Sequence, residues 1–482
     1  MRTSRRQLIR NGERKKMNEL NLGTGKIGSL LRKFSIPCVI SMVVAALYNI
    51  VDQIFIGWSE AGAYGNAATN IVYPFTVLAL GLALLIGDGA AAQFSIALGK
   101  NDTKQANKDI GNGFVILIGL AVVLCIIGLL CRTQVLALFG GNPEEVECYQ
   151  YATDYYKIIC IGIPFYMIGQ GLNGSIRADG SPKFAMACTL AGAITNLILD
   201  PVFIFGFRMG VKGAAIATIL GQIVTFVMSI WYLTRSKNFR INREAVKMDL
   251  STGGRIVSVG MASLIVQLSI VVIIAVNNNL LTKYGYGTYA STGEAFGAVI
   301  PLAVVGIVMK VFGIVVSIVI GISLGGQPIM GFNMGAGNTE RVKETIQLIT
   351  KLVLLVGIIA FLIFELAPDA VIMLFGSRNT AEYMEYARLC IRIFLGGIIL
   401  TCYIKSAAII LQSMGNSLKS TILALLRDVI IFVPASVIIA MISKNIVTML
   451  WAAAISDVIA SVVGFWFIST EIHKFEELMK NL

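Results

Sequence analysis

The stretch Ile-Thr-Asn-Leu-Ile-Leu-Asp-Pro-Val-Phe-Ile, residues 194–204, holds a carboxylate and an amide inside what otherwise has the composition of a membrane-spanning helix. A charge near the centre of a bilayer costs roughly 2.5–3.5 kcal/mol on insertion scales, so it normally faces a cavity, an ion or a partner and not lipid. Asn196 lies one helical turn before Asp200, on the same face. Pro201 removes a backbone donor and tends to bend the helix. The stretch therefore indicates half of an ion site.

The composition of the whole chain supports a membrane location. Of its 482 residues, 56% are hydrophobic and 14% are charged, and the mean hydropathy is +0.79. These values exclude a soluble globular protein. Because each crossing of the hydrocarbon layer takes about 20 residues of helix, the apolar runs predict an all-α polytopic membrane protein with twelve transmembrane helices. The runs lie at approximately 35–57, 67–98, 112–134, 150–176, 184–207, 211–234, 256–281, 292–324, 346–367, 384–411, 417–441 and 445–470.

Basic residues set the expected orientation. Residues 1–34 are basic and polar, with no short apolar core before a cleavage site, so we expect a cytoplasmic segment and no removable signal peptide. Lysines and arginines also gather in alternate loops, which places both termini in the cytoplasm. The net charge of +12 then indicates contact with anionic lipid and not with nucleic acid. The loop residues counted are Lys100, Lys104, Lys108, Arg177, Lys183, Arg235, Lys237, Arg240, Arg243, Lys247, Arg341, Lys343 and Lys419.

Cysteine and histidine usage excludes several kinds of catalytic site. The eight cysteines are scattered through or beside apolar runs without CxxC spacing, which is typical of packing residues and not of metal ligands or a disulfide framework. The only histidine, His473, follows the last apolar run. Ser-His-Asp, HExxH zinc and histidine-relay chemistry are therefore excluded from the membrane interior. We predict neither enzyme activity nor a cofactor.

Two further acids lie inside apolar runs. Asp52, in the polar segment at residues 48–53, is either a second functional buried acid or an aspartate at the outer end of the helix, which Gly57 would mark. Asp88 stands between two glycines, so it is either functional or simply solvated in an irregular segment.

An internal repeat divides the chain into two halves. Residues 89–104 resemble residues 325–341, and residues 176–183 resemble residues 411–419. Because each half has an even number of helices, both halves have the same orientation and are related by a pseudo-twofold axis along the membrane normal. The expected parts are an N-lobe (35–234, helices 1–6), a cytoplasmic linker (235–255), a C-lobe (256–470, helices 7–12) and a cytoplasmic tail (471–482).

Several motifs together resemble the multidrug and toxic compound extrusion (MATE) family, nearest its bacterial MepA-like subgroup. They are Asn49-Ile-Val-Asp-Gln-Ile-Phe-Ile-Gly57, the turn at Leu98-Gly99-Lys100, Ile176-Arg-Ala-Asp-Gly180, Asn196-Leu-Ile-Leu-Asp200-Pro201, Gly213-Ala-Ala-Ile-Ala-Thr218 and Gln327-Pro-Ile-Met-Gly-Phe-Asn-Met-Gly335. The resemblance implies two six-helix lobes that form a V around a central cavity. It also implies export of organic cations or other drugs in exchange for sodium ions or protons.

The resemblance also implies which residues form the sites. A cation site, for sodium or a proton, falls on Asp52, Asn196, Asp200 and Thr218. The expected substrate cavity contains Tyr48, Asn49, Tyr155, Gln170 and Asn173, with Gln170 standing where the family pattern predicts asparagine. The second lobe lacks the acids that another branch of the family uses. It has Glu294, Lys310, Lys405, Arg427 and Asp428 at other places, and we interpret Arg427 and Asp428 as an inter-helix polar network.

Chemistry alone leaves the coupling ion open. Two carboxylates, an amide oxygen and a hydroxyl suit a hard monovalent cation, whereas a proton would need only one carboxylate. In either case the bound ion neutralises the acids and removes their attraction for a cationic substrate. We expect a monomer that binds organic cations or drugs and membrane lipid. Aromatic and methionine side chains either offer apolar surface to a flat drug or simply pack: Phe75, Phe165, Tyr166, Met167, Met309 and Phe312.

The sequence gives weaker support to two other classes of function. A lipid or lipid-linked precursor flippase of the same wider superfamily would need a strongly cationic cavity for phosphate, and the inward-facing candidates are mostly acidic or neutral. A membrane-embedded enzyme would need a nucleophile with a base, or a metal site, and the apolar runs contain no histidine.

Overall fold

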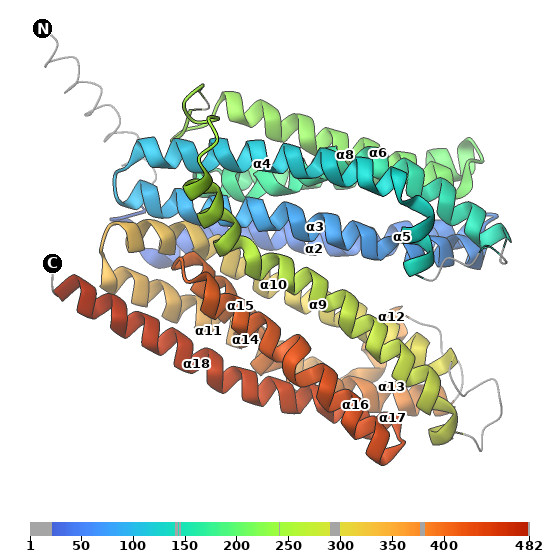
Figure 1. The fold of residues 1–482 in the computed structure, drawn as a ribbon. Helices are drawn as coiled ribbons and strands as arrows, with labels where there is room; N and C mark the ends of the chain where they lie inside the picture. Colours follow the sequence, from blue (N-terminus) through green and yellow to red (C-terminus); the bar gives the residue numbers. More distant parts are fainter. Residues whose placement is uncertain are drawn as a thin grey trace, which may run out of the picture.

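The computed structural model describes residues 22–139, 143, 146–240, 242–289, 299–375 and 381–480. Over these ranges the chain forms helices and no strands (Figure 1). The first half contains α2 (Ile27–Trp58), α3 (Gly62–Gly99), α4 (Thr103–Leu130), α5 (Arg132–Leu138), α6 (Val146–Ala178), α7 (Pro182–Pro201) with the π-helical turn η1 (Val202–Gly206), and α8 (Gly210–Thr234).

The second half has the same number of long helical segments. It contains α9 (Leu250–Tyr289), α10 (Val299–Gly335), α11 (Thr339–Leu366), α12 (Pro368–Phe375), the pair α13 (Ala381–Phe394) and α14 (Ile398–Ser413), α15 (Ser417–Leu425) with the π-helical turn η3 (Leu426–Ile431) and α16 (Phe432–Ser443), and finally α17 (Ile446–Met449) and α18 (Trp451–Lys480).

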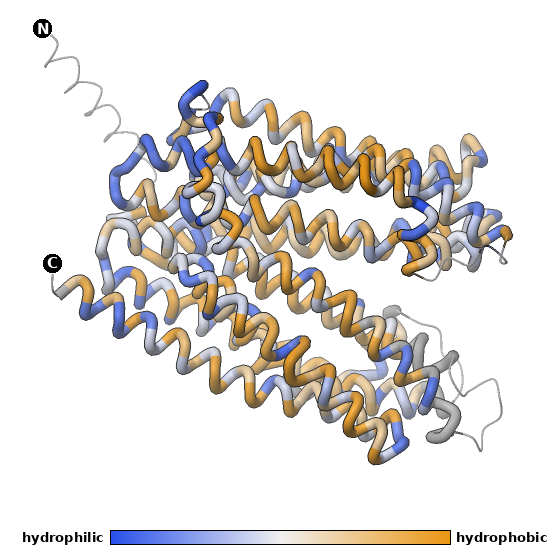
Figure 2. Tube along the Cα trace, viewed as in Figure 1, coloured by the Kyte–Doolittle hydropathy of each residue, from blue (hydrophilic) through white to orange (hydrophobic). Residues whose placement is uncertain are grey.

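Most of these helices are long and apolar enough to cross a membrane. Among the described residues ten pass that test, or eleven when α13 and α14, bent by 48°, count as one span. The long helix α6 is not among them, because polar residues interrupt its apolar run. Apolar residues fill the middle of the helices and polar residues collect at their two ends, as expected for a membrane-embedded bundle (Figure 2).

Each half of the chain has its own apolar core. One core joins α3, α4, α6 and α8, and the other joins α10, α11, α14, α16 and α18. The first turns of α2 belong to the second core, where Ile27, Leu31 and Phe34 are buried. The helix α2 therefore begins in contact with the C-lobe and continues along the N-lobe.

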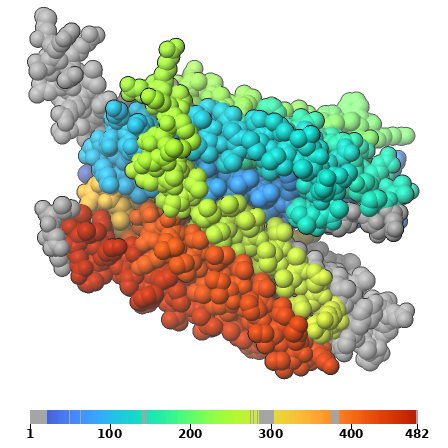
Figure 3. Space-filling model, in the orientation of Figure 1, coloured from blue at the N-terminus to red at the C-terminus, as the bar shows by residue number. Residues whose placement is uncertain are grey.

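The two lobes meet closely at the end where α2 begins and diverge toward the other end (Figure 1). The space-filling view agrees, because its surface is continuous between the lobes at the left and indented between them at the right (Figure 3). Glycines permit the close contact. A Cβ added at Gly335 of α10 would meet the backbone of Ile96 and Gly99 in α3, and one at Gly260 of α9 would meet the backbone of Leu85. Without side chains, these helices pack backbone against backbone.

Polar side chains fix the segment between the lobes. The Asp179 carboxylate accepts hydrogen bonds from the Tyr232 hydroxyl at 2.7 Å and from the backbone N–H groups of Lys237 at 2.7 Å and Asn238 at 2.8 Å. Asp249 accepts from the Thr252 hydroxyl at 2.9 Å, a bond that lowers the pKa of its carboxyl, and from the Ser251 backbone. Because Asp249 caps it, α9 begins at Leu250 and extends into the expected linker.

We expect Gly335→Ala to destabilise the contact between the lobes. The new methyl group would press on the Ile96 carbonyl, so the lobes must separate there or strain, at a cost of about 1–3 kcal/mol. A lower melting temperature of the purified protein would report this cost. The control is Gly119→Ala, where no heavy atom lies within 4 Å of the added Cβ. Equal melting temperatures for the two variants would show that the α3–α10 contact does not require glycine.

Candidate functional site

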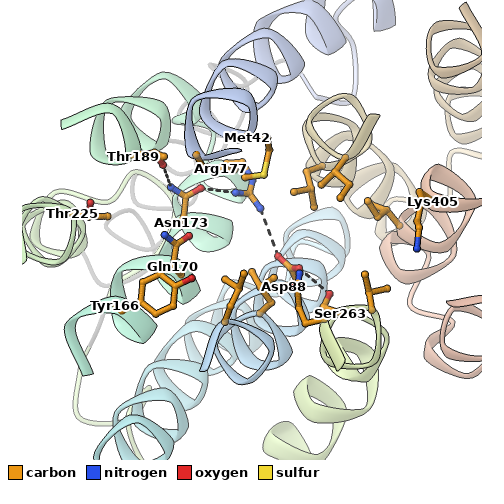
Figure 4. Close-up of a pocket in the computed structure, with 18 of the residues that line it drawn as sticks. Met42, Asp88, Tyr166, Gln170, Asn173, Arg177, Thr189, Thr225, Ser263 and Lys405 are labelled. Atoms are coloured by element: carbon orange, nitrogen blue, oxygen red, sulfur yellow. Dashed lines mark hydrogen bonds and ion pairs between the residues drawn. The ribbon is translucent and has the colours of Figure 1, made fainter. Parts of the chain in front are cut away.

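A cavity of about 270 Å³ lies between the two lobes. Its wall comes from α2, α3, α6, α7 and α8 on one side and from α9, α10, α14, α15 and η3 on the other. Of the residues expected in a substrate cavity, Tyr48, Gln170 and Asn173 line it. Phe165 and Tyr166 also line it, whereas Phe75 packs against the Tyr156 ring. Figure 4 shows Tyr166, Gln170 and Asn173 on one side of the cavity and Lys405 on another.

The four residues of the expected cation site lie together in the N-lobe. The Asn196 Nδ2 group donates to Asp200 Oδ1 at 3.1 Å and to Thr218 Oγ1 at 3.3 Å. Asp52, from α2, is in side-chain contact with Asp200. Three helices therefore meet at this point: α2, α7 and α8. Asp200 is only 1% exposed.

Each carboxylate of the pair has one oxygen without a hydrogen-bond donor. Within the described part of the chain, Asp52 Oδ1 and Asp200 Oδ2 are buried and have no hydrogen-bond partner. Two adjacent carboxylates with buried oxygens repel each other unless a counter-charge is present, which a proton or a metal cation would supply. With the Asn196 and Thr218 oxygens nearby, the donor set fits sodium as well as a proton.

The local backbone favours this placement. Pro201 ends α7, and the π-helical turn η1 follows at once. Such widened turns free carbonyl groups from the regular helical pattern and occur often at functional sites. The sequence predicts a bend after Asp200, and the structure has a π-helical turn at that place.

Tyr155 and Asn49 are the other two residues that the sequence predicts in the substrate cavity. Tyr155 does not line the cavity. It is buried beside the acid pair, close enough for the charges of Asp52 and Asp200 to act on its hydroxyl. The side chain of Asn49 lies outside the described residues, as does Glu294.

An ion pair in the cavity wall was missed by sequence reasoning. The sequence pattern placed Arg177 in a cytoplasmic loop, and this is wrong because α6 continues to Ala178. Arg177 is 5% exposed and lines the cavity, where its Nη2 lies 3.6 Å from Asp88 Oδ1. Its Nη1 donates to Asn173 Oδ1 at 2.5 Å. Asp88 is therefore a buried ion-pair partner and not a solvated acid; the one-turn spacing of Asn173 and Arg177 was the signal available.

The same chain of bonds crosses from one lobe to the other. The Ser263 hydroxyl of α9 donates to Asp88 Oδ2 at 2.9 Å, and Gln412 Nε2 of α14 donates to the Ser263 oxygen at 3.0 Å. The links from Thr189 through Asn173, Arg177 and Asp88 to Ser263 are drawn in Figure 4. In this conformation the floor of the cavity is thus held by both lobes.

A second polar cluster lies in the C-lobe. Arg427 donates to Asp428 at 2.8 Å and to Asp457 at 2.9 Å, and Lys405 contacts Asp428 at 2.6 Å. The Thr401 hydroxyl also donates to Asp457, at 2.8 Å. The structure thus places Arg427 and Asp428 in an inter-helix network, as expected, and adds Asp457, which sequence reasoning missed. Lys310 is exposed on α10.

The charges on the cavity wall are mostly positive. Among the described lining residues the charged ones are Asp88, Arg177, Lys405 and Arg427. The sequence predicts that the inward-facing residues are mostly acidic or neutral, and most lining residues are neutral, but the charged ones are mainly basic. The reason is position: Asp52, Asp200, Asp428 and Asp457 do not line the cavity, and the last three are each only 1% exposed.

Two six-helix lobes around a shared cavity define a membrane transporter built from repeated halves. A model of the MatE family matches residues 37–202 and again residues 274–438. The chain therefore belongs to the MatE family of multidrug efflux transporters, which are not enzymes, and the predicted MATE resemblance is confirmed. The twelve-helix, two-lobe prediction is confirmed with it.

Individual relatives agree. The chain is similar to multidrug export protein MepA of Staphylococcus aureus (strain MSSA476), 24% identical over 399 residues that cover 83% of this chain and 84% of that protein. Among solved structures, an outward-facing multidrug resistance MATE family transporter is 22% identical, with a TM-score of 0.86 over 95% of this chain and 98% of that one. A MOP superfamily transporter from Pyrococcus furiosus, described as having a binding pocket of reverse polarity, is 22% identical with a TM-score of 0.85 over the same shares.

We expect the C-lobe network to be essential for stability. Asp457→Ala leaves the buried Arg427 guanidinium without one of its two carboxylates, which typically costs about 3–5 kcal/mol. A large fall in melting temperature would show this. The control is Asp369→Ala, because the Asp369–Arg388 pair is 42% and 48% exposed and such pairs contribute little. Equal falls for both variants would contradict a special role of burial.

Proposed function

We propose that the protein exports small organic compounds from the bacterial cytoplasm in exchange for inward-moving sodium ions or protons. It works as a monomer in the cell membrane with both termini in the cytoplasm, and it alternates between a cavity open to the outside and one open to the cytoplasm. MepA, a multidrug export protein, is a relative over most of the chain. The single observation that carries the exchange mechanism is the pair of adjacent carboxylates, Asp52 and Asp200, each of which has a buried oxygen without a donor.

The position of Asn196 and Thr218 supports a link between ion and cargo. Both residues line the central cavity, and the Asn196 amide also binds Asp200. An ion that enters the acid pair competes for the oxygens that the Asn196 amide now holds, so the cavity wall must adjust when the ion binds. Exchange then follows if each conformation binds either the ion or the cargo better than the other does.

The shape of the molecule supports one assignment of state. The lobes are joined by backbone contacts at the end where α2 begins and diverge at the opposite end. With the termini in the cytoplasm, this is the state that faces outward. It is also the state in which an external cation reaches the acid pair along the cavity.

The test is gradient-driven transport of a fluorescent compound in proteoliposomes. We expect Asp200→Asn to reduce the transport rate to about a tenth or less of the native rate, since an amide cannot take up and release the coupling ion. Both a cationic dye, rhodamine 123, and an anionic dye, carboxyfluorescein, serve as cargo. A sodium gradient at equal pH and a pH gradient without sodium identify the ion.

The control for this test is Glu147→Gln, which removes an exposed acid at the start of α6. It should transport like the native protein. Transport by Asp200→Asn at the native rate would remove the acid pair from the mechanism. No transport of either dye under either gradient would contradict exchange of organic compounds.

A lipid or lipid-linked precursor flippase is the second candidate, because Arg177, Lys405 and Arg427 line the cavity and could meet a phosphate. The same vesicles test it with a phospholipid that carries a fluorescent headgroup or chain. Flippase activity predicts that the protein makes dye on the inner leaflet accessible to an external quencher. The exporter proposal predicts that dye on the inner leaflet becomes accessible to the quencher no faster than in protein-free vesicles.

A further inference from the structure

We propose that the exported compound carries an acidic group, a carboxylate or a phosphate, which binds to the basic wall of the cavity at Lys405, Arg427 and Arg177. This inference rests on the proposed export function and names the chemical class of its cargo. It replaces the organic cation that the acids of the sequence suggested.

The first argument is the sign of the charge that cargo would meet. The described wall carries three cationic side chains and one carboxylate, Asp88. Asp428 and Asp457, which neutralise the C-lobe cluster, are each 1% exposed and lie behind Lys405 and Arg427. The positive ends of these pairs are therefore nearer to a bound compound than the negative ends. A wall of this kind attracts an anion and repels a cation.

The second argument is the number of donors still available. A lysine ammonium has three N–H donors, and in the described structure Lys405 donates one of them, to Asp428 at 2.6 Å. A guanidinium has five, and Arg427 donates three, to Asp457, Asp428 and, at 3.4 Å, Thr401. An acidic group could therefore bind both side chains without breaking their existing ion pairs. No buried charge would be left unpaired by its arrival.

The third argument comes from the opposite wall. Arg177 Nε is buried and has no acceptor among the described residues, and its contact with Asp88 is long, at 3.6 Å. The guanidinium is thus only partly satisfied by its own lobe. Figure 4 shows it in the cavity wall between Asn173 and Asp88. An acceptor on the cargo would add a hydrogen bond to this guanidinium, which lines the cavity.

The rest of the wall fits an apolar or aromatic body attached to the acidic group. Phe165 and Tyr166 line the N-lobe side, and Ile320 and Leu324 line the C-lobe side. A compound with a flat ring system and one acid group would bury its rings against these side chains while the acid meets the basic residues.

The experiment is equilibrium binding to the purified full-length protein, measured by fluorescence anisotropy. Carboxyfluorescein and rhodamine 123 share a xanthene ring system and differ in charge, so the pair isolates the sign of the cargo. We expect carboxyfluorescein to bind at least about tenfold more tightly than rhodamine 123. Tighter binding of rhodamine 123, or no binding of carboxyfluorescein, would overturn the proposal even if rhodamine transport confirmed export.

Variants locate the site. Lys405→Gln should weaken carboxyfluorescein binding about tenfold and should not weaken rhodamine 123 binding, because the lost charge repels a cation while Arg427 still pairs with Asp428 and preserves the fold. Lys405→Arg keeps the charge and should restore binding. Lys183→Gln, at an exposed position at the start of α7, is the matched loss of charge outside the cavity and should bind like the native protein. Unchanged binding by Lys405→Gln, with a native melting temperature, would overturn the assignment.

A displacement experiment distinguishes a lipid phosphate from a soluble aromatic acid as the source of the acidic group. Dihexanoyl phosphatidic acid and dihexanoyl phosphatidylcholine are added to bound carboxyfluorescein. Displacement by the phosphatidic acid alone would support a lipid-like phosphate as the cargo, and displacement by benzoate but by neither lipid would support a soluble aromatic acid. Failure of all three to displace the dye would overturn the anion subsite.

Discussion

A charge buried between transmembrane helices needs a counter-charge or a set of hydrogen-bond donors, and the buried acids of this protein meet that need in different ways. Asp428 and Asp457 are neutralised by Lys405 and Arg427 within the protein. The carboxylates of Asp52 and Asp200 meet each other instead, and each has an oxygen without a donor. The first arrangement is complete without a ligand, whereas the second is complete only when something positive is bound. This contrast supports the proposal that the coupling ion binds in the N-lobe.

The acid pair and the basic wall are separate, which constrains how exchange can work. Direct competition between a cationic cargo and the coupling ion for the same carboxylates would need those carboxylates in the cavity wall, and they lie behind it. Coupling must then pass through side chains that touch both places. Asn196 and Thr218 meet that condition, because they line the cavity and share the hydrogen bonds around Asp200. Binding of the ion would thus affect binding of the cargo through the position of the Asn196 amide and through the conformation of the lobes.

The parts of the site that the sequence could predict are those with local spacing or rare composition. Asp200 with Asn196 one turn earlier, followed by Pro201, is such a pattern, and an acid in an apolar run, such as Asp52, is another. Thr218 came only from the family resemblance. Arg177 could not be placed by counting basic residues in loops, because the count does not show that α6 extends to Ala178 and buries this side chain. The sign of the charges that line the cavity could not be predicted from the sequence either. It depends on which member of each ion pair lies at the cavity surface.

Two π-helical turns among the described residues lie next to the buried charges. The turn η1 follows Asp200 in the fifth long helix, and η3, in the matching helix of the second half, contains Arg427 and Asp428. Both halves therefore widen the same helix next to their buried charges. A widened turn exposes carbonyl oxygens and lets side chains project at angles that a regular helix does not allow. The backbone of the repeat thus supplies two equivalent places for polar chemistry. The side chains then make one of them an acid pair that needs a cation and the other a network that is already neutral and turns its positive groups toward the cavity.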